Sequence, residues 1–82
     1  MKEIRVQVKF KEGLHARPAV KLVKLAGGME SNVTLEKNGK QIPADSITAV
    51  LGACIVCGDE VTVRAEGSDE EAAIAALAEY FA

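Results

Sequence analysis

The sequence predicts an α+β fold of element order βαββαβα: a two-layer, open-faced sandwich in which a four-stranded antiparallel sheet carries three helices on one face. Four segments alternate apolar and polar residues with the period of a strand that buries one face, and three others favour helices. Strands that need cover on one face only indicate a single layer of helices against the sheet. The 82 residues are enough for one domain, residues 1–82, with a modest core.

The first two elements are a strand and a helix. Residues 3–10 alternate apolar and mostly charged side chains, as in a strand with one buried face. Residues 14–26 predict a helix, because their apolar side chains recur at helical spacing. These side chains are Ala16, Ala19, Val20, Val23 and Ala26. We expect the glycine pair at 27–28 to end this helix in a left-handed conformation.

A hairpin and a short helix follow. Residues 31–37 alternate again, and Asn38 with Gly39 is a strong signal for a two-residue turn, so residues 40–43 should fold back as a short strand. Residues 45–53 predict a short helix that begins near Ser46.

The last two elements complete the order. Residues 60–66 alternate as a fourth strand, and residues 68–82 are the clearest helix. Ser68 and Glu71 match a capping box, and the acidic residues between them suit the positive end of the helix dipole. The predicted inward stripe of this helix is Ile74, Leu77, Ala78 and Phe81.

Composition excludes several classes of protein. A formal charge of −2 argues against a nucleic-acid partner, which would call for a basic stripe. The longest apolar run, Ile47 to Cys57, is too short to span a bilayer, and the alternating residues 1–10 do not resemble a signal peptide. Two cysteines do not make a disulfide framework and fit a reducing compartment. We therefore expect a cytoplasmic domain without membrane insertion.

The single histidine, His15, stands where the first helix is predicted to start, because Pro18 is tolerated in a first helical turn. A helix N-terminus presents unpaired N–H groups and the positive end of the dipole, so it suits an anion and disfavours a second proton on the imidazole. A neutral ring at this place can attack phosphorus. Arg17 and the backbone N–H groups of Ala16 and Arg17 would then hold the phosphoryl group. The alternative is a surface histidine that serves only as an N-cap, with Arg17 solvated.

The motif "GLHARPA", residues 13–19, resembles the active-site motif of HPr, the histidine-containing phosphocarrier of the bacterial sugar phosphotransferase system. "LEKNGK", "DSI" and "AEGSDEEAAI" extend the resemblance over essentially the whole chain without a shift in spacing. The resemblance implies that His15 accepts a phosphoryl group on Nδ1 from Enzyme I and passes it to the A domains of Enzyme II. It places Arg17 beside the phosphate. It also implies the open-faced fold, and a protein substrate of phosphotransferases rather than a stand-alone catalyst.

Ser46 falls at the regulatory serine that a dedicated ATP-dependent kinase phosphorylates in many Gram-positive members of this family. The resemblance therefore adds an HPr kinase/phosphorylase and a transcriptional regulator as further partners. As a helix-cap serine it could carry a phosphate without disturbing the fold, because the dipole favours the charge. Capping alone would also explain the residue. Asp45 stands where these relatives usually carry lysine, and its charge would oppose a phosphate.

The expected partner-docking residues lie on the first two helices: Val20, Lys24, Ile47, Thr48 and Leu51. Thr48 and Leu51 replace methionines of the family's flexible apolar patch, which leaves a smaller patch. Glu12 would be a poor neighbour for a phosphohistidine. These departures leave room for an alternative, a diverged regulatory paralogue that acts as a phosphorylation-dependent binding module.

Cys54 and Cys57 form C-x-x-C, so a redox or metal module is a third, weaker alternative. A structural zinc site needs four ligands and no second pair exists. The pair also follows the end of a predicted helix, where the dipole has the wrong sign to activate a thiol. We expect buried or half-buried loop cysteines, no metal, no cofactor, and a monomer.

Overall fold

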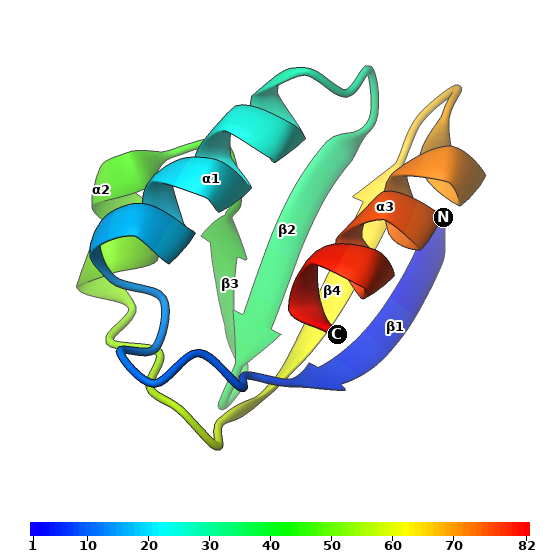
Figure 1. The fold of residues 1–82 in the computed structure, drawn as a ribbon. Coiled ribbons are helices and arrows are strands. Elements are labelled where there is room, and N and C mark those ends of the chain that lie inside the picture. Colours follow the sequence, from blue (N-terminus) through cyan, green and yellow to red (C-terminus); the bar gives the residue numbers. More distant parts are fainter.

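The computed structural model describes all 82 residues, and its seven elements follow the predicted order (Figure 1). The strands and helices are β1 Lys2–Gln7, α1 Ala16–Gly27, β2 Asn32–Lys37, β3 Lys40–Pro43, α2 Ile47–Gly52, β4 Glu60–Glu66 and α3 Glu70–Phe81. The sheet is antiparallel with strand order β1-β4-β2-β3. All three helices lie on one face of it, so the predicted α+β open-faced sandwich is confirmed.

The core lies between the sheet and its layer of helices. Alternate residues of β2 and β4 point into it, among them Leu35 and Val63, which are fully buried. From the helices, Leu22 and Leu77 close the other side. The opposite face of the sheet is polar: Arg64 bridges Glu3 on one neighbouring strand and Glu36 on the other. None of the helices is long and apolar enough to cross a bilayer.

The inward face of α1 differs from the prediction. Ala19, Leu22 and Ala26 are its buried residues, whereas Val20 is 44% exposed and Ala16 is also exposed. Both sets follow helical spacing, and the larger side chain of Leu22 faces the core. In the last helix, Leu77 and Phe81 are buried as predicted and Ala73 is buried as well, whereas Ile74 and Ala78 are half-buried.

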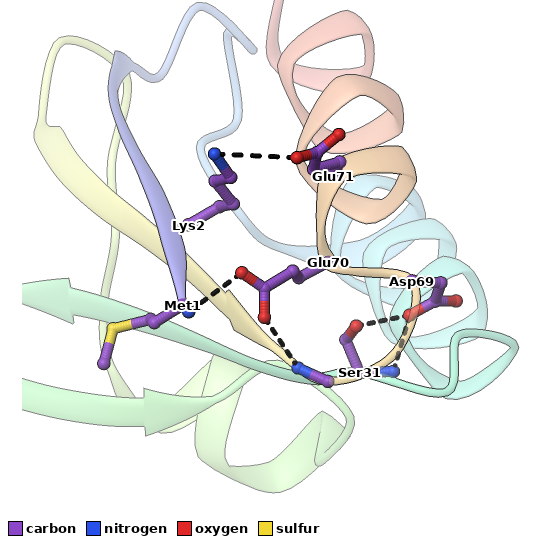
Figure 2. A network of polar contacts seen from close by, with 7 residues as sticks. Met1, Lys2, Ser31, Asp69, Glu70 and Glu71 are labelled. Carbon is purple, nitrogen blue, oxygen red and sulfur yellow. Dashed lines mark hydrogen bonds and ion pairs between the residues drawn. The ribbon is translucent and has the colours of Figure 1, made fainter.

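The predicted capping box of α3 is wrong. The N-cap residue is Asp69, not Ser68, and the Ser68 hydroxyl donates to Glu30 instead. The Asp69 carboxylate accepts hydrogen bonds from the backbone N–H and the hydroxyl of Ser31, which is 5% exposed (Figure 2). Glu70, not Glu71, reaches back to a backbone N–H, that of Gly67. Long-range contacts with the start of β2 have therefore replaced the local cap.

Two element ends also differ. Strand β1 ends at Gln7, because Gly58 at φ +95° turns the partner chain away, although Val8 N–H still donates to the Asp59 carbonyl at 2.8 Å. Helix α1 does not end in a left-handed residue: Gly28 has φ −86° and ψ −5°. The chain leaves the helix through a further turn, in which Met29 N–H donates to the Ala26 carbonyl at 3.2 Å.

Candidate functional site

His15 is the N-cap residue of α1, as predicted, with an extended backbone at φ −125° and ψ 160°. Its side chain makes no capping hydrogen bond, and the residue is half-buried rather than enclosed. The imidazole is therefore not used to satisfy the helix end. This removes the main support for the alternative in which His15 serves only as a capping side chain.

The backbone turns sharply directly after His15. Ala16 has φ +52°, a left-handed conformation that is uncommon for a residue with a side chain and costs on the order of 1 kcal/mol. The N–H groups of Ala16 and Arg17 lie in the first turn, where helix geometry provides no intrahelical acceptor. Together with the dipole, these donors make the start of α1 suited to an anion.

Unpaired positive charge lies on the exposed face of α1. Arg17, Lys21 and Lys24 are exposed and take part in none of the ion pairs of the structure, and no acidic residue lies in the first turn of the helix. Arg17 is two residues from His15 and is free to bind an oxyanion with its planar set of donors. Glu12 is also exposed and makes no ion pair.

The loop that carries His15, residues 8–15, rests on the segment 54–59 that joins α2 to β4. Leu14 N–H donates to the Ile55 carbonyl at 3.0 Å, and both side chains are fully buried. Gly13, at φ +69°, lies so close that a Cβ there would be 2.3 Å from the Ile55 oxygen. The sequence offered no signal for this contact, because 41 positions separate Leu14 from Ile55.

Ser46 is the N-cap residue of α2, as predicted. Its hydroxyl accepts a hydrogen bond from Ala49 N–H at 3.3 Å and lies 3.2 Å from the Thr48 hydroxyl. The residue is half-exposed, and Asp45 beside it is exposed. A serine hydroxyl at this point is accessible from solvent and lies at the positive end of a helix.

The five expected docking residues are all exposed. Val20 and Lys24 lie on α1, and Ile47, Thr48 and Leu51 lie on α2. The two helices contact each other, so these side chains share one surface of the molecule. Ile47 and Leu51 are each 37% exposed, so the apolar part of this surface is small.

The expectation of buried or half-buried cysteines is wrong, because Cys54 and Cys57 are both exposed and free. Ile55, between them, occupies the core position instead. Cys54 has φ +54°, a left-handed conformation that is uncommon for a residue with a side chain. No group of three or more His, Cys, Asp or Glu side chains is arranged as a metal site.

Comparison with known proteins gives close relatives over nearly the whole chain. The chain is 42% identical over 80 residues to the HPr-like protein Crh of Bacillus subtilis (strain 168), covering 98% of this chain and 94% of that protein. The crystal structure of a phosphocarrier protein HPr from Bacillus anthracis str. Ames superposes with a TM-score of 0.94 at 41% identity, covering 99% of this chain and 96% of that one.

A dimeric relative is less similar in shape. The HPr dimer from Thermoanaerobacter tengcongensis superposes with a TM-score of 0.75 at 42% identity, covering 96% of this chain and 91% of that one. Relatives of this chain thus include a protein described as a dimer, and the expected monomer remains a prediction.

The family model for the PTS HPr component phosphorylation site matches residues 2–82. This match includes His15, Arg17 and every element of the fold. The family match agrees with the similarity to HPr and HPr-like proteins and with the open-faced sandwich of the structure. The chain therefore belongs to the HPr family of phosphocarriers.

Proposed function

We propose that this chain is a cytoplasmic phosphoryl carrier that accepts a phosphoryl group on Nδ1 of His15 from Enzyme I and transfers it to the A domains of Enzyme II during sugar uptake. One observation carries the proposal. The half-buried His15 is the N-cap residue of α1 but its side chain makes no capping hydrogen bond, and Arg17, two residues later, forms no ion pair. Membership of the HPr family supports it.

The transfer follows from the local geometry. The Nδ1 lone pair attacks phosphorus, a P–N bond forms, and the bond from phosphorus to its carrier group on Enzyme I breaks, with the electron pair leaving on that group. The phosphoryl group then carries close to two negative charges next to the first-turn N–H groups of Ala16 and Arg17 and the Arg17 guanidinium. In transfer to an Enzyme II A domain, a nucleophile of that domain attacks phosphorus and the P–N bond to His15 breaks. No cofactor or metal enters this scheme.

Incubation with Enzyme I and phosphoenolpyruvate tests the proposal. We expect an acid-labile, alkali-stable phosphate that is absent from His15→Ala and present in Ser46→Ala. Arg17→Ala should accept phosphate at least about tenfold more slowly, because a charge-assisted contact to the phosphoryl group is worth about 1.5–3 kcal/mol. Label that persists on His15→Ala would reject the assignment.

A second candidate is a regulatory binding module that acts when Ser46 is phosphorylated, and the similarity to the HPr-like protein Crh favours it. A phosphate on Ser46 would lie at the N-terminus of α2, where the dipole stabilises it, and would repel an acidic partner from the docking surface. An HPr kinase/phosphorylase and a transcriptional regulator would then be partners. An ATP-dependent, acid-stable phosphate that Ser46→Ala abolishes would establish this role; an unlabelled wild type would exclude it.

The presence of both His15 and Arg17 favours the carrier over a purely regulatory module, which has no need of a nucleophile. We further propose that the carrier works as a monomer. A monomer would leave the exposed docking side chains of α1 and α2 free for Enzyme I and Enzyme II. Sedimentation equilibrium gives the mass directly, and a dimer at micromolar concentration would contradict the proposal.

A further inference from the structure

Lys37 lies at the end of β2 and reaches the segment 54–59 that supports the His15 loop. Its ammonium group contacts the Asp59 carboxylate at 2.7 Å and donates to the Cys54 carbonyl at 3.1 Å. One side chain therefore ties together both ends of this segment. The pair is shielded, since the two side chains are only 20% and 25% exposed.

Asp59 is held from two directions. Besides Lys37, its carboxylate accepts a hydrogen bond from Val56 N–H at 2.9 Å. These two donors, with Lys37 the larger contributor, hold the pKa of Asp59 below its ordinary value. The carboxylate is therefore ionised at neutral pH, and the contact with Lys37 is a true ion pair.

The tied segment is in direct contact with the loop before the acceptor histidine. Ile55, between the two points where Lys37 binds, accepts the hydrogen bond from Leu14 N–H and lies against Gly13. Leu14 is the residue immediately before His15. A displacement of the segment is passed to the N-cap of α1 through one hydrogen bond and one close backbone contact, because the packed Leu14 and Ile55 side chains leave no space to absorb it.

We propose that Lys37 is a positioning residue for phosphoryl transfer: with Asp59 it fixes the segment 54–59, and through Ile55 it sets the position of His15. This inference rests on the proposed carrier function. Lys37 is not one of the docking side chains on α1 and α2, and its contact is with the Cys54 carbonyl just beyond α2. We expect its loss to change the alignment of the imidazole and not the affinity for Enzyme I. Transfer is sensitive to such alignment, since a displacement of about 1 Å can cost about 100-fold in rate.

The test compares Lys37→Met with Lys37→Arg and with Lys2→Met. Methionine keeps the length of the stem without the charge, arginine keeps the charge, and Lys2 makes only an exposed ion pair with Glu71 at 3.7 Å. With Enzyme I and phosphoenolpyruvate, we expect Lys37→Met to lower kcat by about tenfold with KM unchanged. Lys37→Arg should restore most of the rate, and Lys2→Met should match the wild type.

Amide hydrogen exchange gives a second readout that needs no partner. Exchange of the Leu14 N–H should become faster in Lys37→Met and stay unchanged in Lys2→Met. Asp69→Asn, which weakens the contact at the other end of β2, controls for general destabilisation. The inference is overturned if Lys37→Met leaves kcat and Leu14 exchange as in the wild type, or if Asp69→Asn lowers kcat equally. A wild type that Enzyme I cannot phosphorylate would reject the carrier function instead, while the exchange at Leu14 would still test the tie.

Discussion

Gly13 shows how closely two backbones approach beside His15. Its φ of +69° lies in the left-handed region, and a Cβ there would be 2.3 Å from the Ile55 carbonyl oxygen and 2.7 Å from the Val56 Cα. Both obstacles are backbone atoms, so no side chain can rotate away to make room. The loop therefore depends on the absence of a side chain at this position.

Gly13→Ala should destabilise the fold by more than about 2 kcal/mol, because conformational strain adds to the backbone clash. Gly39→Ala is the matched control: it has φ +81° but nothing within 4 Å of its added Cβ, so it should cost only about 1 kcal/mol. Urea unfolding followed by circular dichroism measures both. Equal losses in the two variants would contradict the close approach.

At the residue scale, local signals were sufficient for the N-cap positions of α1 and α2. His15 and Ser46 both cap helices as predicted, because proline in a first turn and serine before an apolar run are local signals. The Asp69 cap could not be predicted in the same way. Its partner Ser31 is 38 positions away, and the fold alone brings them together.

At the scale of elements, the end of α3 is joined to the start of α1. The Tyr80 hydroxyl donates to the Pro18 carbonyl in the first turn of α1. The Tyr80 ring packs edge-on against Phe81, with centroids 5.0 Å apart, and lies 5.3 Å from the Phe10 ring. This aromatic cluster packs α3 against Phe10 of the loop before His15, and the Tyr80 hydroxyl extends the contact to the first turn of α1.

Tyr80→Phe should lower the free energy of unfolding by about 1 kcal/mol, since it removes one hydrogen bond and keeps the ring. Tyr80→Ala should cost clearly more, because the contacts with Phe10 and Phe81 are lost as well. Thermal unfolding of the two variants separates the contributions. A Tyr80→Phe variant as stable as the wild type would show that solvent replaces the hydrogen bond.

Element types and their order followed from periodicity and turn signals, whereas the inward faces of the helices followed only in part. In α1, two stripes are compatible with helical spacing, one through Val20 and one through Leu22, and contact with the sheet selects the second. The wrong prediction of buried cysteines has the same cause, because packing against the core and not local sequence decides which residue is buried. Their burial depends on which residue of the loop reaches the core, and Ile55 does.

At the scale of the whole molecule, three carboxylates hold distant parts of the chain together and should set the stability in acid. Hydrogen bonds from Ser31 and Glu30 N–H lower the pKa of Asp69, and Lys37 lowers the pKa of Asp59. The N-terminal ammonium group, 2.8 Å from Glu70, lowers the pKa of that carboxyl (Figure 2). Each therefore binds a proton more weakly in the folded state than in the unfolded state.

Their stabilising contributions are present above the ordinary carboxyl pKa values and are lost as pH falls through the lower folded values. We expect the unfolding temperature to be nearly constant between about pH 5 and 8 and to fall below about pH 4. Asp69→Asn should flatten part of that fall, whereas Glu66, an exposed residue, provides a control as Glu66→Gln. Identical acid profiles for Asp69→Asn and the wild type would contradict the expected role of Asp69.

In alkali, the stability of the fold should fall as pH rises. Burial raises the pKa of Tyr80 to about 12, so the folded protein retains the phenolic proton where the unfolded chain loses it. Its contribution is fully present below about pH 10 and is lost as pH rises toward 12, so stability should decline over that interval. Tyr80→Phe should remove this decline, which unfolding experiments between about pH 9 and 12 would measure.

The exposure of Cys54 and Cys57 governs how reporters can be attached to this molecule. Both thiols flank Ile55, so a dye or spin label coupled to either would sit beside the loop that carries His15. A thiol-free background with Arg5→Cys is the better choice, because the Arg5 side chain is 71% exposed and lies on the sheet face that no helix covers. Fluorescence from that position would follow encounters with added proteins without altering the surroundings of His15.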